Sequence, residues 1–133
     1  MSCKSAIYTA MQTPTGVAVG GVIPLGSLIR RYGGDIELNG NAVNLTGAGY
    51  YDVDASISVA PIAAGTVTVS LHQNGVAVPG TSASAALTEG TVSDLSITAL
   101  VRQVCCAAGS ALTLVLTGAA STVSNVALRV QRV

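Results

Sequence analysis

The chain has 133 residues, of which half are hydrophobic and only 9% are charged. Six basic and six acidic side chains give a formal net charge of zero. This composition is too apolar for a disordered chain, and it lacks the basic surface that general nucleic-acid binding requires. The length predicts one domain over residues 1–133, with residues 1–22 as an N-terminal strand or arm.

The core has to be built from small aliphatic side chains, because the chain has four Tyr but no Phe and no Trp. An excess of β-branched residues favours strands over helices. With so few charges, a monomer would expose much apolar surface, which favours burial of part of it between subunits. The alternative is that the many Ser, Thr, Asn and Gly residues supply enough neutral polarity.

Membrane insertion is a weaker explanation for the apolar composition. The most hydrophobic stretch near the N-terminus, residues 17–29, contains several glycines and one proline and is too short for a spanning helix. The first 16 residues lack the apolar segment of a secretory signal. We therefore expect synthesis in a cytoplasm, which is compatible with later assembly into a particle.

The first half of the chain alternates apolar and polar residues between turn signals. The clearest case is residues 47–61, where one face of a predicted strand carries apolar side chains and the other carries Asp52, Asp54 and two serines. We expect the first face to point into the core: Tyr51, Val53, Ala55, Ile57 and Val59. Asn39-Gly40 predicts a type I′ hairpin. The other strand candidates here are residues 5–11, two short pieces within 17–30, 35–38 and 42–45.

The second half continues the same pattern, and Asn74-Gly75 predicts a second type I′ hairpin. About ten short strands without a convincing helix indicate an antiparallel β-sandwich of the jelly-roll or immunoglobulin type. Periodicity alone does not separate these two topologies. The strand candidates are residues 66–73, 76–78, 81–88, 91–104, 110–117 and 126–130.

Three features together resemble a known family. They are the strand Gly49-Tyr50-Tyr51-Asp52-Val53 after a glycine turn, the later hairpin VTVSLHQNG, and an apolar strand ending near Val130. This order resembles the jelly-roll family of tumour necrosis factor and the complement globular heads, and most of all its bacterial and phage members. The resemblance covers about residues 23–133 and implies a ten-stranded jelly roll that forms a tight homotrimer for binding or assembly.

Catalytic and metal-binding groups are sparse. His72 is the only histidine, and it lies on the polar side of its strand, where a surface role is more frequent than a general base with an oriented partner. Cys105 and Cys106 are adjacent, so they point to opposite faces of a strand, and Cys3 is far away in sequence. We expect thiols without a reactive role, no metal and no cofactor.

Two charged motifs need separate interpretation. Asp52 and Asp54 share one strand face and could join Asp94 and Asp35 in a calcium site if loops converged, but a solvated or interfacial face is the simpler interpretation. The segment 30–32, Arg-Arg-Tyr, could bind a phosphate or a glycan. More often such arginines pair with nearby acids, here Asp35 or Glu37, or with a neighbouring subunit.

Three functions remain. The first is a non-enzymatic head, fibre or decoration protein of a bacteriophage virion, made in the bacterial cytoplasm, with itself and other virion proteins as partners. The second is an adhesion head on a spore or cell surface that binds glycans. The third is a small carbohydrate-active or isomerase enzyme on a jelly roll. Cupin-type enzymes on such scaffolds bring histidine and glutamate metal ligands, and this chain has one His and two Glu.

Recognition is expected on loops at one end of the trimer, because strands commit one face to the core and a tight trimer would hide much of the other. The candidate loops are residues 39–41, 73–75 and 79–82. The side chains expected to contact a ligand or receptor are Asn39, Asn41, Gln73, Asn74 and Thr81.

Overall fold

A computed structural model describes residues 5–103 and 109–133. The described residues contain twelve β-strands and no helix, so none that could span a membrane, and the expected all-β architecture is confirmed. The strands in chain order are β1 (Ala6–Met11), β2 (Thr15–Val17), β3 (Ser27–Tyr32), β4 (Ile36–Asn39), β5 (Ala42–Leu45), β6 (Gly49–Pro61), β7 (Gly65–Gln73), β8 (Val76–Ala77), β9 (Ala83–Leu87), β10 (Ser93–Gln103), β11 (Ser110–Thr117) and β12 (Ser121–Arg132).

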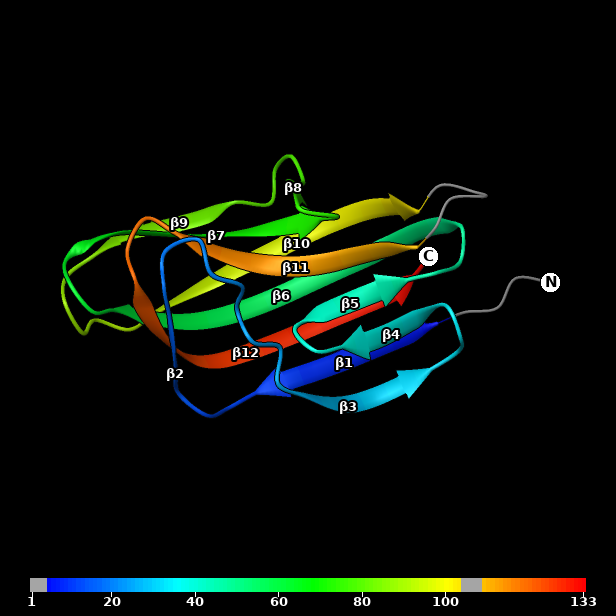
Figure 1. Cartoon of the computed structure of the whole chain (residues 1–133), viewed down its shortest axis with the longest axis horizontal. Helices are drawn as coiled ribbons and strands as arrows, with labels where there is room; N and C mark the ends of the chain where they lie inside the picture. The colour runs from blue at the N-terminus through cyan, green and yellow to red at the C-terminus, as the bar shows by residue number, and fades with distance from the viewer. Residues whose placement is uncertain (1–4, 104–108) are drawn as a thin grey trace.

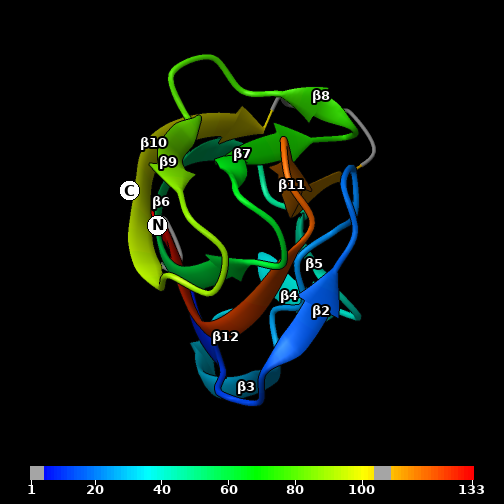
Figure 2. The same ribbon diagram turned by 90° about the vertical axis from the view of Figure 1, so that its left-hand side faces the viewer.

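The strands form two antiparallel six-stranded sheets that pack face to face (Figures 1 and 2). Sheet A has the order β10, β6, β12, β1 and β3, with β2 added on β12. Sheet B has the order β4, β5, β11, β7 and β8, with β9 added on β7. Neighbours such as β6 and β12 are far apart in sequence, as expected in a jelly roll. The N-terminal strand β1 lies inside sheet A, between β12 and β3.

The core lies between the sheets and follows the alternation expected for β6. Tyr51, Val53, Ile57 and Val59 are fully buried there, whereas Asp52 and the other intervening residues face outward, so the predicted register is confirmed. Facing residues of sheet B, from β7 and β11, alternate in the same way. Each sheet therefore has one aliphatic face that is removed from water on packing.

The sequence predicts no strand between residues 11 and 17, but Thr15–Val17 is strand β2, which pairs with the start of β12. The chain then crosses from sheet A to sheet B, where Val22 pairs with Val115 of β11. On this crossing Ile23 and Leu25 become fully buried. The segment from β2 to Leu25 is therefore a strap that closes one side of the sandwich.

The two Asn-Gly hairpins differ. Asn74 and Gly75 both have positive φ, at 54° and 81°, which is the predicted type I′ geometry. At the other hairpin Asn39 pairs with Ala42, and only Gly40 of the two central residues has positive φ. The hairpin is confirmed, but its turn is of type II′ with glycine at the first central position, so the predicted type I′ was wrong.

A polar network closes the sandwich at the end where the chain termini lie (Figure 1). Arg132 of β12 makes an ion pair of 2.6 Å with Asp35 and donates a hydrogen bond of 2.7 Å to the Ala48 carbonyl. The Tyr51 hydroxyl donates to the Gly47 carbonyl at 2.6 Å. Burial raises the pKa of the Tyr51 phenol above 10, and the Asp35 carboxylate acts in the same direction. This network joins the last strand of sheet A to the loops that flank β4 and β5.

Candidate functional site

The turn between β4 and β5 presents the most accessible of the expected contact residues. Asn39 and Asn41 are exposed, and their amides have no hydrogen-bond partner among the described side chains and backbone. Exposed amides can both donate and accept hydrogen bonds, so this turn is able to contact a polar ligand. It remains a candidate contact.

Gln73 and Asn74 are already engaged within the fold. The Gln73 amide nitrogen donates to the Arg102 carbonyl at 3.0 Å and to the Ser110 hydroxyl at 3.1 Å, and this ties β7 to β10 across the two sheets. Asn74 accepts a hydrogen bond of 3.0 Å from the Ala111 N–H through its side-chain oxygen. The exposed amide nitrogen of Asn74 makes none of these bonds and is left for a ligand.

Thr81 does not present its side chain to solvent. It is 2% exposed, and its hydroxyl donates to the Val78 carbonyl at 2.6 Å and accepts from the Leu71 N–H at 3.2 Å. These bonds hold the segment after β8 against β7. A loop position in the sequence gave no sign of this burial, and a ligand contact of Thr81 stays a prediction.

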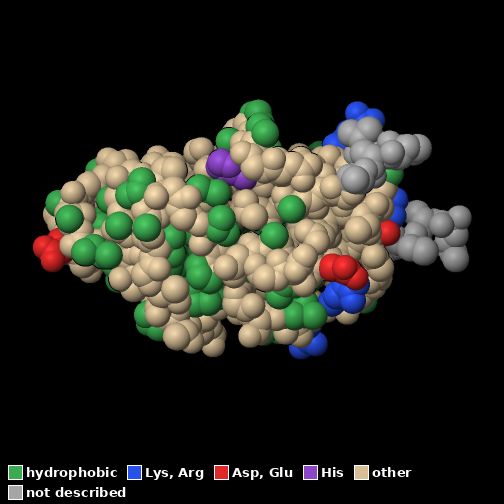
Figure 3. All heavy atoms as spheres, viewed as in Figure 1, with side chains coloured by type: hydrophobic (Ala, Val, Ile, Leu, Met, Phe, Trp, Pro, Cys, Tyr) green, Lys and Arg blue, Asp and Glu red, His purple; other side chains and the backbone are tan. Residues whose placement is uncertain are grey.

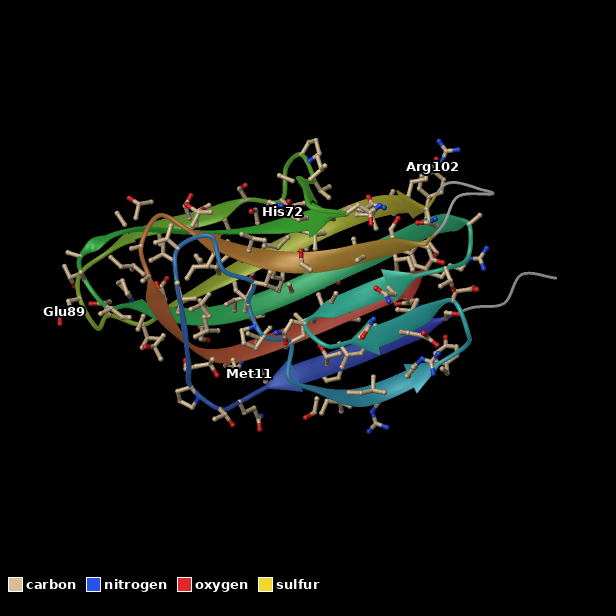
Figure 4. The ribbon with its side chains drawn as sticks, viewed as in Figure 1. Met11, His72, Glu89 and Arg102 are labelled. Carbon is tan, nitrogen blue, oxygen red and sulfur yellow. The ribbon has the colours of Figure 1, made fainter. Side chains whose placement is uncertain are left out.

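The expected contact loops do not lie together in the structure. The β4–β5 and β7–β8 turns belong to opposite edges of sheet B, with β11 between them. The end remote from the termini is instead made by the loops that follow β6, β9 and β11 (Figure 1). There Ile62 donates to Ala120 and Gly90 donates to Pro61, each at 3.0 Å. Figure 4 shows Glu89 at this end and Arg102 at the opposite one.

His72 has partners, but none that would make it a general base. Its Nε2 lies 3.1 Å from the Ser70 hydroxyl and its Nδ1 lies 3.4 Å from the Gly75 carbonyl. A carboxylate that could orient the ring is not among these partners. Within the described ranges there is no group of three or more potential metal ligands. The expectations for Cys3, Cys105 and Cys106 concern residues outside those ranges.

The four aspartates considered for calcium are held separately. Asp54 and Asp52 both lie next to the guanidinium of Arg129, with Asp52 at 3.7 Å. Asp94 accepts a hydrogen bond of 2.5 Å from the Ser58 hydroxyl. Asp35 pairs with Arg132 at the end of the sandwich. The four aspartates therefore do not converge: Asp52 and Asp54 share Arg129, and Asp94 and Asp35 each have a different partner.

The arginine motif is divided between two environments. Arg31 donates to the Ile36 carbonyl at 2.8 Å and lies 3.5 Å from a Glu37 oxygen, as one of the expected pairings predicted. Arg30 points to the other side of β3, and it makes no ion pair within the described part of the chain. Tyr32, on the same side as Arg30, is 57% exposed.

The outer face of sheet A gathers features that the sequence did not bring together. Three of the four tyrosines emerge on it, and Leu100 is 62% exposed in the middle of β10. Near its centre the face is hollowed by about 330 Å³, because small side chains lie beside the cross-strand row of Tyr8, Arg129 and Asp54. The small side chains that line this hollow are Ser56, Ser96, Thr98 and Ala127.

The outer face of sheet B is different. Its strands turn Thr, Ser, Asn and Ala outward, and Figure 3, which shows this face, has charged side chains mainly toward the end with the termini. Exposed apolar side chains such as Val22 and Val76 interrupt this face, but its hydroxyl and amide groups are compatible with water. The sequence pattern did indicate which residues of each strand face outward, but the neighbours of each residue depend on strand order.

The comparisons with known proteins match the fold and not the sequence. No family model and no curated protein matches the chain. Among solved structures, murine APRIL gives a TM-score of 0.73 at 12% identity, covering 98% of this chain and all of that one. The globular domain of zebrafish complement 1qA gives 0.66 at 8% identity, covering 95% and 94%. The vertex protein P5 of phage PRD1 gives 0.62 at 10% identity, covering 97% and 96%. The described part of the chain therefore has the jelly-roll fold that the resemblance implied.

Proposed function

We propose that this chain is a non-enzymatic structural or attachment module that works as a homotrimer, and that it is a head, fibre or decoration protein of a bacteriophage virion. The observation that carries the proposal is the outer face of sheet A. It combines exposed tyrosines, an exposed leucine and a hollow of small side chains. Protein interfaces are enriched in aromatic residues, and this face presents three of the four tyrosines.

The charges at the centre of the same face are compatible with burial against another subunit. Arg129 binds Asp54 and lies near Asp52, so most of the charge at the centre is compensated within one subunit. Removing paired charges from water costs less free energy than removing isolated charges does. The neutral outer face of sheet B lacks this combination and would remain toward solvent.

The absence of an enzyme activity in this proposal rests on the chemistry of the side chains. His72 is bonded to Ser70 and to a backbone carbonyl, and in the described residues it has no carboxylate partner. The aspartates are engaged with arginines or with Ser58. General acid–base catalysis needs such groups to face a shared cavity, which is not their arrangement here.

The virion assignment draws on the likeness to the vertex protein P5 of PRD1, which matches over nearly the full length of both chains. Two measurements test it. Light scattering at micromolar concentration should report a trimer, and mass spectrometry of purified particles from the producing strain should find the chain in the virion. A stable monomer would contradict the proposed trimer. Detection of the chain only in the cell lysate would contradict the proposed place in the virion.

The second candidate is an adhesion head of a spore or cell surface that binds glycans. It is favoured by the exposed amides of Asn39 and Asn41 on the β4–β5 turn. A glycan array with the wild type, the pair Asn39→Ala and Asn41→Ala, and the control Thr66→Ala would test it. Binding that is lost only in the asparagine variant would favour adhesion, and an array without binding would count against it.

A further inference from the structure

The two edges of sheet A carry an apolar projection and an apolar hollow. The projection is Leu100, which lies in the middle of the edge strand β10 and points away from the core. A single exposed leucine is ordinary on a protein surface. Its position becomes informative because of what lies at the opposite edge.

The hollow lies between β1 and β3, at the other edge. It has a volume of about 200 Å³, with Tyr8 and Tyr32 beside the small side chain of Ala6 and with Arg30 at its margin. Ile7, Arg31 and Arg129 complete its lining, and the lining atoms that face the hollow are almost all carbon. An apolar cavity of roughly 150 Å³ takes a benzene-sized group, so this hollow has room for the side chain of a leucine.

The projection and the hollow lie at the same height along the strands. Leu100 pairs with Asp52, Asp52 with Gln131, Gln131 with Ala6, and Ala6 with Tyr32. These five residues form one cross-strand row over β10, β6, β12, β1 and β3. Residues in one row share one face of the sheet and one level on the strand axis.

We propose that Leu100 of one subunit inserts into the Tyr8–Tyr32 hollow of the next subunit. The two patches are different surfaces, so the contact is heterologous. Because they lie at one level, the next copy is related by a rotation about an axis near the strand direction with little shift along it. Such a contact closes into a ring and does not grow into a filament. The inference rests on the homotrimer proposed above and adds which surfaces meet.

Charge at the two patches is complementary. Arg30 stands at the margin of the hollow and makes no ion pair with a described residue of its own chain. Asp52 is the direct cross-strand neighbour of Leu100, and its nearest cation, Arg129, is 3.7 Å away and already bound to Asp54. Insertion of Leu100 brings Asp52 of one subunit toward Arg30 of the next, which favours a second copy of this chain as the occupant.

Other exposed apolar side chains do not have this arrangement. Val76 is 70% exposed, but it lies on β8 at the edge of sheet B. Val92 and Ile62 lie at the loop end remote from the termini, outside the row of Leu100. Val76 therefore serves as a matched control for exposure without the proposed contact.

A disulfide test uses a background in which Cys3, Cys105 and Cys106 are replaced by serine. In it, Ala6→Cys and Leu100→Cys are combined in one chain, and the control combines Ala6→Cys with Val76→Cys. Within one subunit Ala6 and Leu100 are three strand spacings apart, about 14 Å, which a disulfide does not span. Mild oxidation should therefore give a covalent trimer in the test chain, and the control chain should stay uncrosslinked.

The outcomes separate this inference from the proposed function. If light scattering reports a trimer but oxidation gives no covalent product, the Leu100 contact is wrong and the proposed trimer stands. A monomer under all conditions would overturn both. As a second arm, Leu100→Ser should raise the trimer dissociation constant at least tenfold, whereas Val76→Ser should leave it within twofold. Equal effects of the two substitutions would also overturn the contact.

Discussion

The outer faces of the two sheets follow the same alternation but carry different chemistry. Sheet A turns tyrosines and several charges outward: Tyr8, Tyr32, Tyr50, Arg30, Asp52, Asp54, Asp94, Arg102 and Arg129. In sheet B, the titratable residues that the described strands turn outward are Glu37 and His72. Equal periodicity therefore does not mean equal function. The face with aromatic and paired charged groups suits contact with protein, and the hydroxyl-rich face suits water.

The largest expected effect comes from a charge placed on each face in turn. Ser56 lines the central hollow of sheet A, and Thr66 is an exposed hydroxyl residue of sheet B. Ser56→Arg adds bulk and a positive charge beside Arg129, so we expect the trimer to dissociate to monomers at micromolar concentration. Thr66→Arg should leave the trimer unchanged. Light scattering of both variants measures their oligomeric state. A Ser56→Arg variant that stays trimeric would mean that the subunits associate through another face.

A smaller effect is expected from the arginines of β12. Arg132 is mostly buried, with its ion pair to Asp35 and its bond to the Ala48 carbonyl, whereas Arg129 is about half exposed. We expect Arg132→Met to lower the free energy of unfolding by about 2 kcal/mol, because Asp35 is left unpaired, and Arg129→Met by under about 1 kcal/mol. Urea unfolding at one fixed protein concentration measures both. A larger loss of stability in Arg129→Met than in Arg132→Met would show that the exposed ion pair on the outer face of sheet A stabilises the fold more.

Tyr51→Phe should change both stability and its dependence on pH. The lost hydrogen bond to the Gly47 carbonyl should cost about 1 kcal/mol at neutral pH. Burial raises the pKa of Tyr51, so the unfolded chain releases this proton near pH 10 while the folded chain still holds it. The unfolded state then binds fewer protons, and the free energy of unfolding falls as pH rises above 10.

Urea unfolding between pH 9 and 11.5 would show that fall in the wild type and a smaller one in Tyr51→Phe. Tyr50→Phe, one residue away and exposed, controls for the loss of a tyrosine hydroxyl. An identical slope in the wild type and Tyr51→Phe would show that Tyr51 does not retain its proton in the folded state.

Much of the fold could be predicted because alternation is a local property. The alternation over nine successive positions of β6 predicts which of its residues face the core. The type I′ turn at Asn74-Gly75 follows from two residues. The strap that buries Ile23 and Leu25 was not predicted, since its structure depends on pairing with β11. At the other hairpin, the pairing of Asn39 with Ala42 decides the turn type.

The candidate surface was harder to predict than the fold. The row from Leu100 to Tyr32 joins five strands whose order in sheet A is not their order in the chain. Loop composition suggested Thr81 and Gln73 as contacts, but hydrogen bonds within the fold use both side chains. Polarity in a loop does not show whether a group already has a partner.

A stabilising effect is expected on the inner side of sheet A, where Thr9 interrupts the apolar face. Thr9 is fully buried, next to Leu128 and Leu28 in the sheet, and its hydroxyl has no hydrogen-bond partner among the described residues. A buried hydroxyl without a partner is destabilising, and valine has nearly the same shape. Thr9→Val should therefore raise the free energy of unfolding by about 1 kcal/mol. Thr9→Ser, which keeps the hydroxyl and removes a methyl group, should lower it by a similar amount. Urea unfolding of the two variants compares them directly, and a loss of stability in Thr9→Val would show that the hydroxyl does have a partner inside sheet A.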